Sequence, residues 1–131
     1  MKALSVLVAD DEEEIRSLLI HWLVAAGHTV TSVANATEAR RIIGQQRFDL
    51  VVTDVLMPEG DGIQLMKELK DAQPAARILA ISGGGRYIEG DDCLKIARGF
   101  GAHAAVTKPF TREQIIAGMQ QALAPQPAVG S

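Results

Sequence analysis

Short apolar runs alternate with amphipathic helical stretches along the whole chain. The apolar runs have strand length, and the stretches between them repeat apolar residues every three or four positions. The predicted strands lie at residues 3–9, 28–33, 49–52, 77–82 and 104–107. This alternation predicts an α/β fold with a mostly parallel sheet and helices on both faces. The second run mixes Thr with Val, as is typical of a less buried edge strand.

The first helix is predicted from one apolar stripe that follows the first strand. Its members share the spacing of one helix face and are Ile15, Leu18, Leu19, Trp22, Leu23 and Ala26. Gly27 comes next and suits the left-handed conformation that often ends a helix. Similar stripes predict a third helix over residues 61–72 and a fourth over residues 93–100.

Capping signals mark the starts of the second and the last helix. Asn35 is followed three positions later by Glu38, and Thr111 is followed in the same way by Gln114. In a capping box the first residue binds a free amide of the helix, and the second binds back to the cap. We therefore expect these two helices to begin directly after Asn35 and Thr111.

Length and charge limit the possible functions. The 131 residues suffice for one domain, expected over residues 1–124, with a flexible tail or linker start over residues 125–131. A net charge of −3 gives no support for sequence-independent binding of nucleic acid, which needs a basic face, so no direct contact with nucleic acid is expected. No apolar run approaches the length of about 18 residues that a membrane span needs, and the N-terminus lacks a signal-peptide pattern. A cytoplasmic protein without membrane contact is expected.

Polar side chains gather at the carboxyl ends of the predicted strands. Asp10 and Asp11 follow the first strand, and Asp54 follows the third. Ser82 ends the fourth strand, and Lys108 follows the fifth. In an open parallel sheet these ends meet at one edge, where ligands bind. Carboxylates so close together favour a hard divalent cation such as Mg²⁺, and an aspartate can attack phosphorus to form an aspartyl phosphate.

Each of these signals has an ordinary structural explanation when taken alone. An acidic pair can charge a helix N-terminus, a Gly-rich run after Ser82 can be a flexible turn, and a lone lysine is usually solvated. Their coincidence at four strand ends favours a shared site. Residues 12–14 are interpreted as a solvated first helical turn. The three histidines lack ligand spacing and are interpreted as structural: His21, His28 and His103.

Four segments together resemble the receiver domain of bacterial two-component response regulators. They are VLVADDE (6–12), FDLVVTDVLMPEGDGIQL (48–65), ILAISG (78–83) and AAVTKPF (104–110). The resemblance extends over nearly the whole chain. It implies a flavodoxin-like (βα)5 fold, a doubly wound parallel sheet with strand order 2-1-3-4-5.

The resemblance also implies a role for each residue of the expected site. Asp54 corresponds to the phospho-accepting aspartate. Asp11 corresponds to a direct Mg²⁺ ligand, and Asp10 to a residue that binds Mg²⁺ through water. Asp54 and the backbone carbonyl of Leu56 correspond to the remaining Mg²⁺ ligands that the protein supplies. Ser82 corresponds to the switch hydroxyl.

The resemblance assigns Lys108 to the phosphoryl group and implies a cis bond to Pro109. It further implies a phosphoprotein that assists its own phosphorylation and dephosphorylation and is not otherwise an enzyme. The phosphoryl donor would be a sensor histidine kinase or a histidine phosphotransfer domain. Output would pass to a protein partner through the fourth helix, the fifth strand and the fifth helix. As given, the chain is expected to be a stand-alone receiver.

The chain departs from the family pattern in three respects. Ala105 stands where the family often has an aromatic residue coupled to the switch hydroxyl, so output by that coupling is not expected. The segment 82–92 is longer and richer in glycine than the usual connection. Leu56 and Gly84 occupy the variable positions beside the phosphoryl group, where an apolar residue suggests altered dephosphorylation.

Other functions compatible with these residues are weighed against the receiver. A pseudo-receiver would be an interaction module without phosphate, but the five site residues are intact. A small phosphohydrolase with an aspartyl-phosphate intermediate resembling haloacid dehalogenases would place its nucleophile on the first strand. A flavodoxin would carry a Ser/Thr/Gly-rich phosphate loop after the first strand, where this chain has acidic residues.

Overall fold

The computed structural model describes residues 3–55, 61–83, 99 and 101–125, and its centre is one five-stranded sheet. All four strand pairings are parallel, in the order β2-β1-β3-β4-β5. The strands are β1 (Ser5–Ala9), β2 (Thr29–Val33), β3 (Leu50–Asp54), β4 (Arg77–Ser82) and β5 (Ala104–Thr107). The predicted flavodoxin-like order 2-1-3-4-5 is confirmed.

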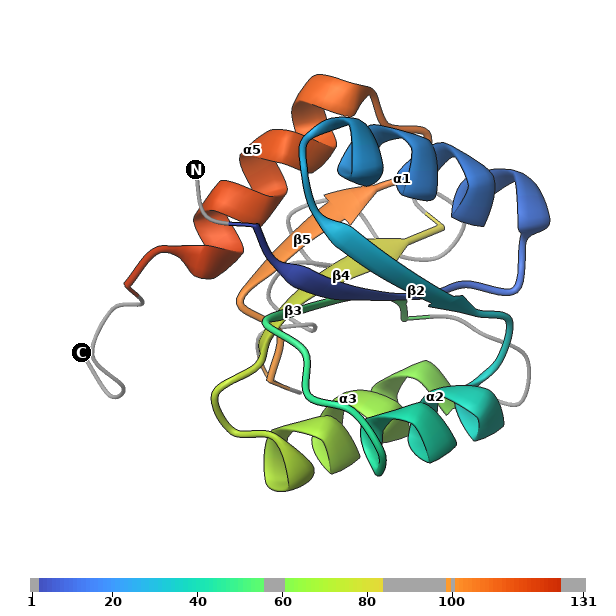
Figure 1. Ribbon diagram of the computed structural model, residues 1–131, viewed down its shortest axis with the longest axis vertical. Coiled ribbons are helices and arrows are strands. Elements are labelled where there is room, and N and C mark those ends of the chain that lie inside the picture. Colours follow the sequence, from blue (N-terminus) through green and yellow to red (C-terminus); the bar gives the residue numbers. More distant parts are fainter. Residues whose placement is uncertain (1–2, 56–60, 84–98, 100, 126–131) are drawn as a thin grey trace.

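Helices cover both faces of the sheet. They are α1 (Glu13–Ala25), α2 (Ala36–Ile43), α3 (Asp61–Ala72) and α5 (Arg112–Leu123). Helices α1 and α5 lie on one face, and α2 and α3 lie on the other (Figure 1). The helix predicted over residues 93–100 lies outside the described residues, apart from Gly99. Within the described part of the chain, no helix combines the length and the apolar character needed to cross a membrane.

Alternate residues of the central strands build two separate apolar layers. In β1, Val6 and Val8 pack toward α1 and α5, whereas Leu7 and Ala9 pack toward α2 and α3. This division follows from the two-residue period of a strand. The central strand β3 is buried along its whole length, while the edge strand β2 is buried only at Val33. The expectation of a less buried second strand is therefore confirmed.

The apolar stripe of α1 is narrower than predicted. Leu19 and Leu23 are fully buried, but the side chain of Leu18 is 44% exposed and Ala26 lies exposed beyond the end of the helix. Leu18 stands one position before Leu19, and hence about 100° around the helix from it. Because α1 rests on the sheet along one line, that rotation carries Leu18 to solvent. The predicted stop is confirmed, since Gly27 has a φ of +96°.

Both predicted helix starts are capped. The Asn35 side chain accepts a hydrogen bond from the Glu38 amide at 2.9 Å, and the Glu38 carboxylate accepts one from the Ala34 amide at 3.1 Å. Thr111 and Gln114 bind each other reciprocally in a full capping box. Each such cap contributes on the order of 1 kcal/mol to helix stability. Together they orient α2 and α5 against opposite faces of the sheet.

Candidate functional site

The parallel sheet brings the predicted polar residues to one edge. Asp10 directly follows β1, Asp54 is the last residue of β3, and Lys108 directly follows β5. The strands are in register, with Ala9 opposite Thr53 in the neighbouring strand. Since all strands run the same way, their carboxyl ends meet at this edge. Residues nearly a hundred positions apart thereby become neighbours.

Lys108 lies at the centre of the site. Its Nζ is 2.7 Å from Glu12 Oε1, 3.0 Å from Asp10 Oδ2 and 3.2 Å from Asp54 Oδ2. The Lys108 side chain is 13% exposed, and those of Asp10 and Asp54 are 0% and 5% exposed. One ammonium thus compensates two buried carboxylates and a third at the surface.

Asp10 is anchored through its backbone and through one carboxylate oxygen. Its Oδ1 accepts a hydrogen bond from the Glu12 amide at 2.8 Å, and its carbonyl oxygen accepts one from Arg16 Nη1 at 2.8 Å. Its Oδ2 lies 3.0 Å from Lys108 Nζ, but no donor among the described residues is aligned to form a hydrogen bond with it. Burial raises the pKa of Asp10 above its ordinary value, and the charge of Asp54 raises it further. The hydrogen bond from the Glu12 amide and the contact with Lys108 lower the pKa but do not cancel the rise.

Lys108 remains a cation in this environment. Burial acts to lower its pKa, and it is the largest single influence. The hydrogen bond to Glu12, the charge of Asp54 and the contacts with Asp10 act the other way and together outweigh burial, so the pKa of Lys108 is raised above its ordinary value. The site therefore keeps a permanent positive charge beside the Asp54 carboxylate.

The carboxylates of this edge suit a divalent cation. One oxygen each from Asp10, Asp11, Glu12 and Asp54 lies within 4.8 Å of the others. Asp10 and Asp54 are buried, whereas Asp11 and Glu12 are exposed. Oxygen-only ligands of this kind are those that Mg²⁺ prefers. A cation would also supply the partner that the buried Asp10 Oδ2 lacks among hydrogen-bond donors, so the residues present fit Mg²⁺.

Of two further predicted residues, Ser82 is only partly described and Leu56 is not described at all. Ser82 ends β4 opposite Thr107 of β5, which places its backbone at the same edge, and its side chain lies outside the described part of the chain. Leu56 lies outside it as well, as do Gly84 and nearly all of the Gly-rich segment 82–92. The predicted cis bond between Lys108 and Pro109 is confirmed.

Glu12 is a residue of the site that the sequence interpretation missed. Residues 12–14 were expected to form a solvated helical turn, yet the Glu12 carboxylate makes the shortest of the three Lys108 contacts. Glu12 is the N-cap residue of α1, and its side chain makes no capping hydrogen bond. It is therefore free to reach across the site. A third acidic residue directly after the Asp10–Asp11 pair was the available signal.

A glycine lets α3 approach the end of β3. Gly62 is buried in the first turn of α3, and a Cβ there would overlap the carbonyl oxygens of Asp54 and Val55. Only glycine permits this approach without a shift of the backbone. Asp61 is the first residue of α3, and its side chain lies outside the described part.

Two histidines bind the backbone at the opposite end of the sheet. His28 Nδ1 accepts a hydrogen bond from the Leu4 amide, and His103 Nδ1 accepts one from the Ile78 amide, both at 3.0 Å. Burial lowers the pKa of His103, assisted by the positive charges of Arg77 and Lys70. These contacts agree with the structural role expected of both histidines.

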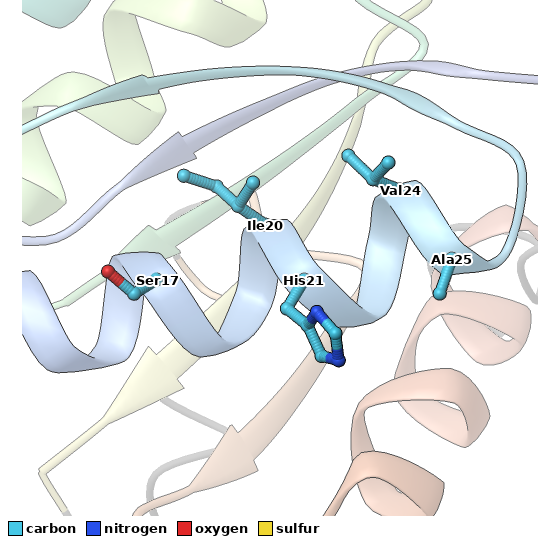
Figure 2. Close-up of a pocket in the computed structure, with 5 residues that line it drawn as sticks. All are labelled: Ser17, Ile20, His21, Val24 and Ala25. Atoms are coloured by element: carbon cyan, nitrogen blue, oxygen red, sulfur yellow. The ribbon is translucent and has the colours of Figure 1, made fainter.

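A shallow surface pocket elsewhere on the molecule is lined, among the described residues, by side chains of α1. Its lining residues belong to the outer side of this helix and are Ser17, Ile20, His21, Val24 and Ala25 (Figure 2). The side chains are mostly apolar, and Val24 is 54% exposed. None of these five residues contributes to the carboxylate cluster, so the pocket is separate from the site at the strand ends.

Comparison with curated proteins identifies bacterial relatives. The DNA-binding transcriptional regulator NtrC of Azospirillum brasilense is 33% identical over 123 residues, which cover 94% of this chain and 25% of the relative. Protein PetR of Rhodobacter capsulatus is 34% identical over 111 residues, which cover 85% of this chain and 45% of PetR. This chain therefore spans between a quarter and just under half of the length of these relatives.

Solved structures share the fold over most of the chain. The chemotaxis response regulator CheY4 of Vibrio cholerae has a TM-score of 0.82 and 27% identity, covering 93% of this chain and all of that one. A response regulator of Burkholderia pseudomallei, solved with a phosphorylated aspartic acid, calcium ion and citrate, has a TM-score of 0.77 and 30% identity, covering 88% of this chain and 66% of that one. The family model of the response regulator receiver domain matches residues 6–120. The chain thus belongs to the response regulator receiver domain family of two-component signalling.

Proposed function

We propose that this domain accepts a phosphoryl group on Asp54 from a histidine kinase or a histidine phosphotransfer protein, with Mg²⁺ bound. The observation that carries this proposal is the position of the Asp54 carboxylate. It is buried at a strand end, 3.2 Å from a permanent cation and within a cluster of carboxylates that fits Mg²⁺. Membership of the receiver family supports the same role.

The transfer assigns a task to each described residue. A carboxylate oxygen of Asp54 attacks phosphorus, the bond from phosphorus to the donor histidine nitrogen breaks, and that nitrogen keeps the electron pair. The Lys108 ammonium offsets the charge of the phosphoryl oxygens. Asp10, Asp11 and Asp54, with the carbonyl of Leu56, would hold Mg²⁺, which neutralises phosphoryl charge when bound. The response regulator from Burkholderia pseudomallei, whose structure holds a phosphorylated aspartic acid and a calcium ion, supports this assignment.

Phosphorylation is proposed to act as a switch of partner binding. The acyl phosphate would draw the Ser82 hydroxyl toward it and shift the domain to a second conformation. The affected surface would comprise the fourth helix, β5 and α5. Ala105 in β5 is partly buried against the core on the side of α2 and α3, so a small side chain occupies the position where the family often has an aromatic one. The switch would therefore run without an aromatic residue there.

The wider setting of the domain belongs to the same proposal. The domain would act as a phosphoacceptor that assists its own phosphorylation and dephosphorylation. Its matched relative NtrC is a DNA-binding regulator, but this chain spans 25% of it. Three expectations stay predictions: that the domain makes no direct contact with nucleic acid, that it is located in the cytoplasm, and that it ends near residue 124.

The alternatives of another class receive less support. A pseudo-receiver would lack the phosphoacceptor machinery, whereas here Lys108, Asp10 and Asp54 are in contact. A small phosphohydrolase resembling haloacid dehalogenases would place its nucleophile on the first strand, whereas Asp54 ends β3. The family match over residues 6–120 favours the receiver over the phosphohydrolase.

Mass spectrometry of the intact protein tests the proposal. The protein is incubated with acetyl phosphate and Mg²⁺, and we expect a mass increase of one phosphoryl group that disappears with excess EDTA. Asp54→Asn should remain unlabelled, while Asp49→Asn, an exposed aspartate just before β3, should be labelled like the wild type. Absence of labelling in the wild type, or labelling of Asp54→Asn, would contradict the assignment.

A further inference from the structure

The Glu12 carboxylate forms an ion pair with Lys108, the cation that would bind the phosphoryl group. Its Oε1 lies 2.7 Å from Lys108 Nζ, closer than the oxygen of Asp54 at 3.2 Å. In phosphoryl transfer to Asp54, Lys108 would have to turn its charge toward the incoming oxygens. A donor phosphate therefore meets a lysine that is already held by a carboxylate.

The backbone of Glu12 is fixed while its side chain remains free to leave. The Glu12 amide donates to Asp10 Oδ1 at 2.8 Å, which ties the residue to the site. Its side chain is 57% exposed and makes no capping contact with α1. The carboxylate can therefore swing into solvent without unfolding the helix. Asp10, by contrast, is fully buried and cannot release the lysine in this way.

We infer that Glu12 competes with the phosphoryl group for Lys108 and thereby slows phosphorylation of Asp54. In the unphosphorylated domain, Glu12 stabilises the resting position of the ammonium. Phosphoryl transfer forms a bond from an Asp54 oxygen to phosphorus, and the donor keeps the electron pair of the bond that breaks. During this step Lys108 exchanges Glu12 for a phosphoryl oxygen. Glu12 thus acts as a counter-ion of Lys108 in the resting domain, and this inference rests on the proposed function.

The expected effect is modest because the pair is half-exposed. Solvent-exposed ion pairs contribute little to stability, which limits the change in rate on removing Glu12 to about two- to fivefold. Glu13 provides the matched control. It is the next acidic residue, it lies exposed in the first turn of α1, and it is not part of the carboxylate cluster.

The first test compares initial rates of labelling by acetyl phosphate at saturating Mg²⁺. Acetate leaves with the electron pair of its bond to phosphorus, so no protein partner is needed. Glu12→Ala should be labelled about two- to fivefold faster than the wild type, and Glu13→Ala should match the wild type. An unchanged or slower rate for Glu12→Ala, or equal acceleration by Glu13→Ala, overturns the competition.

The second test measures the contact without phosphorylation. Urea unfolding of the wild type, Glu12→Ala, Lys108→Met and the double variant gives the coupling between the two side chains. We expect favourable coupling, and additive effects would overturn the contact. If the wild type is not labelled at all, the proposed function fails and the competition with it. A labelled wild type with an unaltered Glu12→Ala rate overturns the competition alone.

Discussion

Replacing Lys108 with methionine should destabilise the domain measurably. Methionine has a similar length but no charge, so Asp10 and Asp54 would lose their shared cation while remaining buried. Removing one partner of a fully buried ion pair costs about 3–5 kcal/mol. Because Lys108 retains 13% exposure and Glu12 can turn to solvent, we expect a loss of about 2–3 kcal/mol in the free energy of unfolding.

Urea unfolding at neutral pH without divalent cations measures this loss. Lys70→Met, at an exposed lysine of α3, is the matched control and should change stability by less than about 0.5 kcal/mol. Adding Mg²⁺ should stabilise Lys108→Met more than the wild type, because the lysine no longer competes for the carboxylates. A Lys108→Met protein as stable as the wild type without Mg²⁺ would refute the view that this ammonium compensates buried charge.

Two further predictions concern the frame around the site. Gly62→Ala should lower the midpoint of urea unfolding by an amount equivalent to about 1–3 kcal/mol, because the added Cβ would overlap the backbone carbonyls of Asp54 and Val55. An unchanged midpoint would show that α3 can shift to make room for the methyl group. The pKa of His103 is lower in the folded chain than in the unfolded chain, so on acidification the imidazole is protonated first in the unfolded chain. Its contribution to stability should be complete above about pH 6.5 and decline below it, so the difference in melting temperature between the wild type and His103→Gln should shrink between pH 7 and pH 5. A difference independent of pH would contradict this.

Local patterns were sufficient to predict most of the fold. The predicted strands over residues 77–82 and 104–107 and the helix over residues 61–72 have the observed bounds. Strand and helix periods differ, so the order of apolar and polar residues separates them without tertiary information. The third strand was predicted to end at residue 52, and it extends to Asp54. Apolar patterning alone could not show that a carboxylate belongs to the strand itself.

The side chains in contact at the site were less predictable than the elements that hold them. Strand-end positions indicated that Asp10, Asp54 and Lys108 would share one edge, and the parallel sheet does bring them together. The same reasoning assigned Glu12 to solvent, because its partner Lys108 lies 96 positions later in the chain. Leu18 was assigned to the core because periodicity gives the width of a stripe only approximately, and its exposure depends on how α1 rests on the sheet.

Local sequence patterns were therefore enough to predict the order of the elements, the parallel sheet and the sheet edge that carries the site residues. Each of these follows from periodicity, capping and the short connections of parallel strands, which act over a few residues. The contacts of the Lys108 ammonium with Asp10, Glu12 and Asp54 could not be predicted in this way and became visible in the folded chain. Contacts of that kind join distant segments, and their distances depend on the packing of the whole sheet.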